Sequence, residues 1–294
     1  MSIRDEEMCL ENTMELEEES EEEINPLDYL SFTRYLYPER SVCHSLLIAL
    51  LERDTEEALF WTYELYYSGV EEDTFAFIKR VYEMFYKKQN PLFSKFIDKM
   101  AAEGDCGIGS IVKSLTYKKY DVSQFVESMF DKNNIDILTA LMNSKCAMEE
   151  NNPKPMKKTI NIVLTKADIE KYKTINHIQP RDVLRNACLY PIRANVADLF
   201  AIPLPETIVN CYRYDWLYYA SRTPIWKERI LCMNGIIDNN KHTVVFTDDD
   251  DREDFYETWG YEPDEQPIDI QHKCIGAPNT LKIDVAGFCQ MFLP

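Results

Sequence analysis

The chain has 294 residues, of which 45% are hydrophobic and 12% aromatic, and it carries a formal net charge of -19. This apolar content is enough for one large domain or two smaller ones, while the acidity argues against direct binding of nucleic acid. The longest apolar run, Leu46–Leu51, is far shorter than the roughly 18 residues of a membrane span, and the N-terminus is acidic. We therefore expect no signal peptide, no membrane span and no secretion.

The negative charge is concentrated near the two ends of the chain. Residues 1–23 hold eleven acids and one basic residue, and Asp248–Glu265 hold ten acids and one basic residue. The first segment is also low in complexity and in aromatic residues, so it cannot bury enough apolar surface to offset its ordering entropy. We predict a disordered acidic tail over residues 1–24, whose candidate contacts with a partner are Glu17, Glu18, Glu19, Glu21, Glu22 and Glu23.

Residues 25–147 have the apolar periodicity of amphipathic helices and are predicted to form a domain of helical hairpins. One helix is expected to start at Ser41 as its N-cap, and a second at Thr55, with acids in its first turn and Gly69 after its end. Short connections between such helices predict antiparallel neighbours. Further helices are predicted around Phe75–Phe85, from Pro91, and over Ile108–Thr116, Val122–Phe130 and Asn134–Ser144.

The helix after Thr55 contains the sequence FWTYELYY, which suits either a buried core or a stacking surface. A surface that stacks nucleic-acid bases interleaves aromatic residues with Lys or Arg. Glu56–Val70 contain no basic residue, so we predict the buried middle helix of a hairpin stack. A monomer core and a subunit interface have the same sequence pattern, and both stay open here.

Residues 148–157, with Pro153 and Pro155, are predicted to be a linker. The remainder, 158–294, is predicted to be a second, mixed domain, so that the fold class is mostly α with a few short strands in the second domain. Its C-terminal residues are apolar enough to dock on the rest of the protein rather than fray. Strands are predicted at Lys158–Leu164 and Thr243–Phe246, and helices at Lys166–Tyr172, Gln179–Leu189 and Ile208–Met233.

Tests for nucleophile and phosphate motifs identify no catalytic residue and no cofactor. Gly104 and Gly109 have the spacing of a phosphate loop, but Ser110 stands where such a loop needs Lys. A helix end followed by a helix start explains these glycines better. The four histidines lack a local nucleophile motif, although a catalytic Cys–His pair that meets only in space stays open.

The cysteines and histidines do not have the spacing of a zinc site. Nine cysteines without a C-x-x-C pair favour free, reduced thiols. Cys43 and His44 are adjacent, which disfavours binding of one ion by both, and His272 with Cys274 is a single pair.

Asp248–Glu265 are predicted to be an exposed acidic loop that caps a helix over Arg252–Gly260. The run lacks the central Gly of an EF-hand and the nearby Lys of a two-metal nuclease, so a metal site here is only a weak alternative. Its weak metal-ligand candidates are Asp248, Asp249, Asp250, Asp251, Glu253 and Asp254. The candidates for binding a basic protein partner are Asp248, Asp249, Asp250 and Asp251.

Three stretches of the sequence resemble a group of proteins encoded by nucleocytoplasmic large DNA viruses. They are ALFWTYELYYSG, NPLF and GYEPDEQ, and the similarity extends over His44–Ile97 and Phe255–Pro267. The group has no assigned activity and no assigned catalytic residues. The resemblance implies a viral source and a location in the host cytoplasm, the viral factory or the particle.

The sequence therefore predicts a non-enzymatic viral protein that acts through protein–protein contacts, in a scaffold, assembly or regulatory role. The compatible partner is a protein, and a basic one fits the two acidic segments. One alternative is an acidic DNA mimic or histone-engaging protein. Another is a metal-dependent enzyme that uses the Asp248–Asp251 cluster. The sequence predicts neither the identity of the partner nor the oligomeric state.

Overall fold

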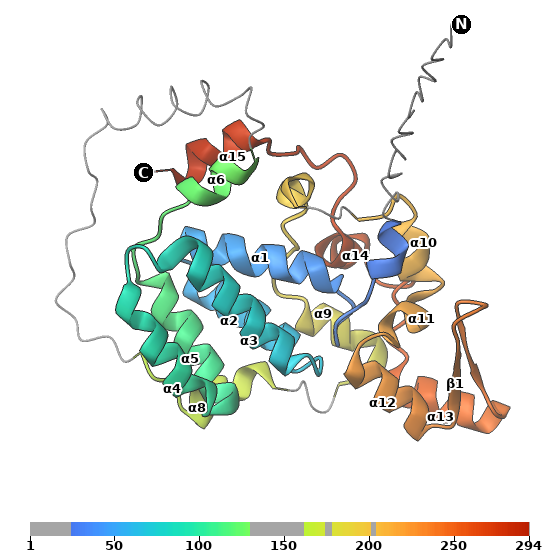
Figure 1. Ribbon diagram of the computed structural model, residues 1–294. Coiled ribbons are helices and arrows are strands. Elements are labelled where there is room, and N and C mark those ends of the chain that lie inside the picture. Colours follow the sequence, from blue (N-terminus) through green and yellow to red (C-terminus); the bar gives the residue numbers. More distant parts are fainter. Residues whose placement is uncertain (1–24, 130–161, 174–177, 201–203, 294) are drawn as a thin grey trace, which may run out of the picture.

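The computed structural model describes residues 25–129, 162–173, 178–200 and 204–293 (Figure 1). Within these ranges the chain is mostly helical and has one sheet, of two antiparallel strands, so the predicted fold class is confirmed. No helix in the described ranges combines the length and the apolar character needed to cross a membrane. The predicted acidic tail, the helix predicted at Asn134–Ser144 and the predicted linker lie outside the described residues.

The first half of the chain consists of helices joined by short turns. Several pairs of consecutive helices pack on each other, as expected for hairpins. Gly104, whose φ is 56°, begins the longest of the described helices after the first two. The elements are α1 (Glu39–Glu52), α2 (Thr55–Tyr66), α3 (Glu71–Val81) with a π-helical turn at Tyr82–Tyr86, α4 (Ser94–Ala101), α5 (Gly104–Thr116) and α6 (Ser123–Met129), with 3-10 turns at Pro26–Tyr29 and Pro91–Phe93.

The first two predicted N-caps are wrong by one residue or more. Helix α1 begins at Glu39 with Pro38 in the N-cap position, so Ser41 lies inside the helix. The N-cap of α2 is Asp54, whose side chain accepts a hydrogen bond from the backbone N–H of Glu57 at 3.0 Å. Asp is at least as good an N-cap as the Thr55 that follows it, and sequence patterns do not separate two adjacent candidates.

Helix α2 is a buried helix, as its aromatic sequence predicts. It packs against both α1 and α5. Trp61 and Tyr63 are fully buried, and the indole N–H of Trp61 donates to Glu57 at 3.0 Å. A Cβ at Gly109 of α5 would lie 2.0 Å from the Tyr63 hydroxyl oxygen, so glycine is required for this close approach of the two helices. The helix is therefore part of the core of the chain itself.

The second half has shorter helices and the two strands. Residues Ile162–Leu164, which were predicted to end a strand, have no strand structure, because the Leu164 N–H donates to the Ser110 hydroxyl of α5 at 2.8 Å. The elements are α8 (Lys166–Ile169), α9 (Val183–Ala187), α10 (Ile208–Arg213), α11 (Trp216–Ala220), α12 (Pro224–Cys232), β1 (Gly235–Asp238), β2 (Thr243–Phe246), α13 (Asp249–Trp259), α14 (Ile268–Ile275) and α15 (Val285–Phe292), with 3-10 turns at Glu170–Tyr172, Pro180–Asp182 and Ala194–Leu199.

The two halves share one hydrophobic core. Residues Leu30–Pro38, just before α1, are called the N-terminal loop. This loop contacts the second half directly. Its Phe32 carbonyl accepts the hydroxyl of Thr223 at 2.9 Å, and its Thr33 carbonyl accepts the indole N–H of Trp226 at 3.0 Å. The domain boundary at the linker, residues 148–157, stays a prediction. The described residues before and after it pack together in one core.

The C-terminal segment docks on the first half, as predicted from its apolar sequence. Phe288 of α15 is fully buried, and its ring centroid lies 5.5 Å from that of Phe125 in α6. Helices α6 and α15 lie side by side in Figure 1. The end of the described chain thus covers the last helix of the hairpin half.

The predicted acidic loop is largely helical, which corrects the sequence prediction. Helix α13 already begins at Asp249, and Asp248 is its N-cap, because the Asp248 carboxylate accepts the backbone N–H of Asp251 at 2.8 Å. Carboxylates are favoured in the first turn of a helix, where the backbone N–H groups and the helix dipole are positive. The acids that were expected to precede a helix therefore form its first turns.

Candidate functional site

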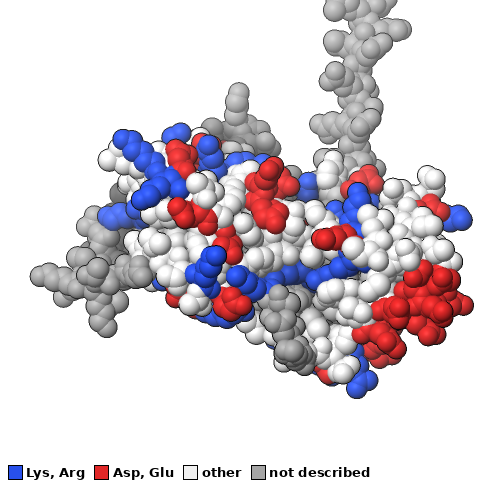
Figure 2. Space-filling model, turned by 90° about the horizontal axis from the view of Figure 1, so that it is seen from below, with Lys and Arg blue, Asp and Glu red and all other residues white. Residues whose placement is uncertain are grey.

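The predicted partner-binding residues that the structure describes lie at one end of the molecule. Asp248–Asp251 are at the start of α13, and Glu253 and Asp254 follow on the same helix. We call these six residues the acidic end. Figure 2 shows a dense group of acidic side chains at the right-hand end of the molecule, where Figure 1 places α13. The tail candidates Glu17, Glu18, Glu19, Glu21, Glu22 and Glu23 lie outside the described residues.

The acidic end is attached to the strand pair by a polar contact. The side-chain amide of Asn234, just before β1, donates to the Asp251 carboxylate at 2.9 Å. The hydroxyl of Thr247, just after β2, donates to the Asn234 carbonyl at 3.0 Å. These bonds hold the start of α13 at the base of the strand pair.

The outer face of the strand pair is apolar and exposed. Ile236 of β1 is directly paired with Val245 of β2, so both side chains point to the same face, with exposed fractions of 59% and 52%. Ile237 and Val244 point to the other face and pack against the core. Leu231 of the neighbouring α12 is also 53% exposed. Phe246, which lies on the same face as Val244, packs against Phe255 of α13, so α13 lies on the inner side of the strand pair. Exposed apolar side chains such as Ile236 and Val245 are typical of a protein-binding surface.

The carboxylates of the acidic end do not converge on a common point. Asp248 and Asp251 are used in the cap and in the contact with Asn234, and Asp249 forms an ion pair with Arg252 at 3.2 Å. In the described residues there is no group of three or more His, Cys, Asp or Glu side chains that could hold a metal ion. The weak metal-ligand candidates Asp248, Asp249, Asp250, Asp251, Glu253 and Asp254 therefore have no support from geometry.

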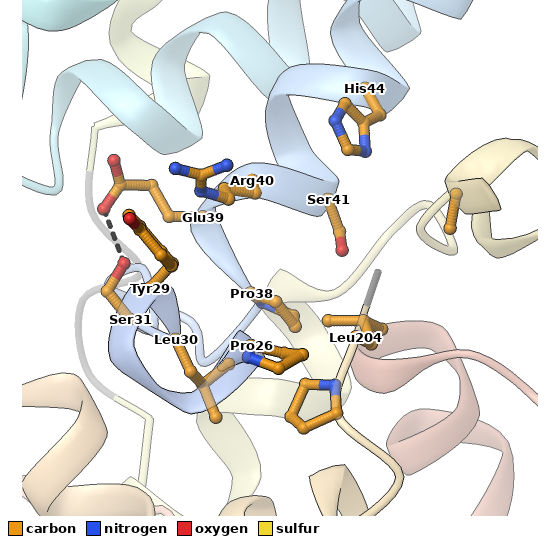
Figure 3. Close-up of a pocket in the computed structure, with 12 residues that line it drawn as sticks. Pro26, Tyr29, Leu30, Ser31, Pro38, Glu39, Arg40, Ser41, His44 and Leu204 are labelled. Atoms are coloured by element: carbon orange, nitrogen blue, oxygen red, sulfur yellow. Dashed lines mark hydrogen bonds between the residues drawn. The ribbon is translucent and has the colours of Figure 1, made fainter. Parts of the chain in front are cut away.

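A small hollow with a free volume of only about 20 Å³ lies between the start of α1 and the segment that follows residue 203 (Figure 3). Its walls include prolines and leucines together with a few polar groups. The Ser31 hydroxyl donates to the Glu39 carboxylate at 2.9 Å, and the Arg40 guanidinium lies 4.6 Å from the centre of the Tyr29 ring. Ser31, Glu39 and Arg40 are thus engaged with neighbours in the wall of the hollow.

His44, which also lines this hollow, is not placed as a proton carrier at neutral pH. Its ring stacks on Phe200 with centroids 4.0 Å apart. Burial, and secondarily the positive charge of Arg40, lower the pKa of His44 to about 4. Burial raises the pKa of the neighbouring Cys43 thiol to about 12, so this adjacent pair supplies neither a thiolate nor an imidazolium at neutral pH.

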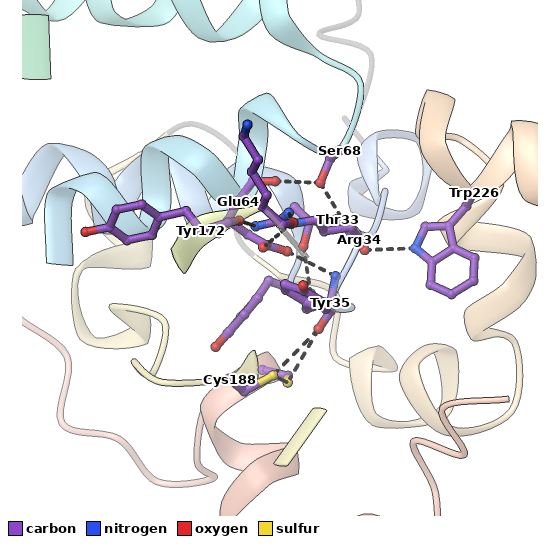
Figure 4. A network of polar contacts seen from close by, with 11 residues as sticks. Thr33, Arg34, Tyr35, Glu64, Ser68, Tyr172, Cys188 and Trp226 are labelled. Atoms are coloured by element: carbon purple, nitrogen blue, oxygen red, sulfur yellow. Dashed lines mark hydrogen bonds and ion pairs between the residues drawn. The ribbon is translucent and has the colours of Figure 1, made fainter. Parts of the chain in front are cut away.

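A buried ion pair joins the N-terminal loop to α2 (Figure 4). The Arg34 guanidinium donates to the Glu64 carboxylate at 3.0 Å, and the side chains are 7% and 0% exposed. Glu64 also accepts the Tyr35 backbone N–H at 3.0 Å, while Arg34 donates to the carbonyls of Tyr172 and Lys173. Burial raises the pKa of Glu64, and Arg34 opposes this shift. The network uses most of the hydrogen-bonding capacity of both groups, so it fixes the loop and is not poised for catalysis.

The sequence prediction did not identify Arg34, Glu64 or the exposed pair Ile236 and Val245. A usable signal existed for the first two, because each is a single charge between aromatic residues, in FTRYLYP and in YELYY. A charge at a position that its neighbours mark as buried needs a partner of opposite sign. The sequence had no such signal for β1, whose Gly-Ile-Ile-Asp is too short for alternation to be recognised.

Comparison of the whole chain with protein-family models, curated proteins and solved structures gave no match.

Proposed function

We propose that the protein is a binding protein whose acidic end and adjoining strand pair receive a partner protein that presents basic and apolar side chains. The observation that carries the proposal is the exposed apolar pair Ile236 and Val245, on a strand pair whose base is bonded to the first turn of α13 through Asn234. The carboxylates would attract and orient a basic segment, and the apolar pair would supply the contact that excludes water. A viral source and a role in the infected cell remain part of this proposal, based on the sequence resemblance.

The two parts of the surface should make separable contributions. Attraction between exposed charges is screened by salt over a distance of about 8 Å at physiological ionic strength, whereas burial of apolar side chains is not. A partner that uses only the charges should dissociate at high salt. A partner that also covers Ile236 and Val245 should keep part of its affinity.

We would test the proposal with two synthetic peptides of equal length and charge, one alternating Lys with Leu and the other alternating Lys with Ser. Fluorescence anisotropy with the full chain should give a lower Kd for the Lys/Leu peptide, and this difference should persist at high salt. Ile236→Ser combined with Val245→Ser should remove the difference between the peptides. The strand pair is small, so circular dichroism of this variant should confirm that its helical content is unchanged.

The charge contribution is tested by Asp250→Asn, Glu253→Gln and Asp254→Asn in one variant. Each weak exposed pair contributes roughly 0.5 kcal/mol, so the three changes together should weaken both peptides about tenfold at low salt. The matched control is Glu71→Gln, Glu72→Gln and Asp73→Asn, which removes three exposed acids from the first turn of α3. Equal weakening by both triple variants would show nonspecific attraction and would refute the site.

The acidic DNA-mimic or histone-engaging alternative uses charge without the apolar pair. It predicts that both peptides bind equally and that the serine variant binds normally. It also predicts that deletion of residues 1–23, which removes Glu17–Glu23, weakens binding as much as changes at the acidic end. The same measurements therefore separate the two functions.

A further inference from the structure

Two buried cysteines from distant parts of the chain are in contact beneath the N-terminal loop. Cys188 directly follows α9 and Cys274 lies in α14, and their sulfur atoms are 3.4 Å apart. Both side chains are almost completely buried. The backbone carbonyl of Tyr35 accepts from both thiols, at 3.8 Å from Cys188 and 4.0 Å from Cys274, and Figure 4 shows Cys188 beside it.

The backbones that carry the two thiols are fixed relative to each other. The Lys273 ammonium donates to the Cys188 carbonyl at 3.1 Å, and the Lys273 carbonyl accepts the backbone N–H of Ile192 at 3.0 Å. A disulfide has an S–S bond of about 2.05 Å, so the sulfurs must approach by about 1.4 Å. Rotation of the two side chains can supply much of this movement without separating the two segments.

We propose that Cys188 and Cys274 form an oxidation site that closes to a reversible disulfide, with hydrogen peroxide as the oxidant. One thiol loses its proton, its sulfur attacks a peroxide oxygen and the O–O bond breaks; the sulfur becomes a sulfenic acid, and the leaving hydroxide takes up the released proton as water. The second sulfur then attacks the sulfenic sulfur, the S–O bond breaks, and a second water leaves. Two thiols are thereby oxidised and one peroxide is reduced to two water molecules.

Burial makes this reaction slow but specific. It raises the pKa of the Cys188 thiol, and the neighbouring Cys274 raises this pKa further, so little thiolate is present at neutral pH. Oxidation should therefore accelerate with rising pH and with mild denaturant, which opens the cover over the thiols. Once one sulfur is oxidised, the other is already in contact and captures it before a second oxidant does.

The cross-link would join positions that are 86 residues apart in the sequence. The segment that it closes contains β1, β2 and α13, so the acidic end would lie inside a covalent loop. A loop of this length restricts the unfolded chain strongly, and we expect the Tm to rise by about 5 to 10 °C on oxidation. The site would link the stability of the second half to the redox state of its surroundings.

The experiment exposes the full-length reduced protein to hydrogen peroxide, stops the reaction, and alkylates the remaining thiols in denaturant. We expect the mass to fall by two hydrogen atoms, two fewer cysteines to be alkylated, and peptide mapping to find Cys188 linked to Cys274. Thioredoxin-type or phosphine reductants should restore both thiols and the original Tm. Peptide maps in which both cysteines remain alkylated, or are linked to other cysteines, would overturn the proposal.

Three alanine variants provide the controls. Cys188→Ala and Cys274→Ala should each abolish the Tm rise, whereas Cys211→Ala, which removes another buried cysteine, should retain it. Because the wild-type peptide map requires no substitution, the proposal stays testable even if one of the variants folds poorly. A Tm rise that persists in Cys188→Ala would also contradict it.

Discussion

The hairpin half around α2 and the end formed by β1, β2 and α13 are stabilised in different ways. Around α2, long helices with apolar stripes bury large aromatic side chains against each other. At the acidic end, short elements are held by single polar contacts, such as the cap by Asp248 and the bond from Asn234 to Asp251. The stability of the first region should therefore respond mainly to changes in side-chain volume and buried charge, and that of the second to the loss of individual hydrogen bonds.

The largest effect is expected at the buried ion pair that joins the N-terminal loop to α2. Arg34→Met leaves the Glu64 carboxylate buried without its cation, so the free energy of unfolding should fall by about 3 to 5 kcal/mol. Chemical denaturation measures this loss. The exposed pair of Lys171 with Glu56 gives the comparison, because Lys171→Met should change stability by less than about 1 kcal/mol.

A smaller and pH-dependent effect is expected at His44. Its pKa is lowered to about 4 in the folded protein, so the unfolded chain binds more protons between about pH 6.5 and pH 4. The folded state should therefore lose stability as the pH falls through this window, by up to about 3 kcal/mol in total. Denaturation of wild type and His44→Asn across the window should show a shallower loss in the variant, and parallel curves would contradict the prediction.

The close approach of α5 to α2 gives a test of packing. Gly109→Ala places a methyl group against the Tyr63 hydroxyl and should cost about 1 to 3 kcal/mol. Adding Tyr63→Phe removes the clashing oxygen, so the double variant should be more stable than the sum of the two single changes predicts. A double-mutant cycle measured by thermal or chemical unfolding provides this comparison.

The smallest effect is expected at the acidic end. Asp248→Ala removes the N-cap of α13 and should reduce stability by about 1 kcal/mol, whereas Asp248→Asn, which keeps the acceptor, should cost less. Hydrogen exchange of the first turn of α13 would report the loss locally. If Asp248→Ala destabilised the chain as much as Arg34→Met, the contrast between the two regions would be wrong.

The sequence predicts the regular parts of the fold well and the irregular parts poorly. Helices α2 and α5 are long enough for apolar periodicity to define them. The cap of α2 is displaced by one residue because Asp54 and Thr55 compete for the position, whereas the N-cap of α1 is Pro38, three residues before Ser41, and Pro38 makes no side-chain cap bond. The strand predicted at Lys158–Leu164 is wrong at Ile162–Leu164, because the backbone of Leu164 is bonded to Ser110, a residue far away in the sequence. Such tertiary bonds leave no periodic signal.

For the candidate site, the sequence predicts the concentration of acidic residues but not which residues meet in space. The run Asp248–Asp251 is enough to predict an acidic surface. The sequence predicts a loop there, whereas the structure has a helix that starts at Asp249. The pairing of Ile236 with Val245 depends on strand register, and the contact of Cys188 with Cys274 depends on how the chain after α9 meets α14. Neither can be obtained from residue types alone.

The N-terminal loop also has a consequence for how the chain acquires its structure during synthesis. Thr33 is bonded to Trp226, a residue that is 193 positions later in the sequence. At a synthesis rate of about 5 to 20 residues per second, the loop must wait roughly 10 to 40 s for this partner to be made. Helices α1 to α5 can pack in that time, but the buried face that the loop covers stays open until the second half emerges.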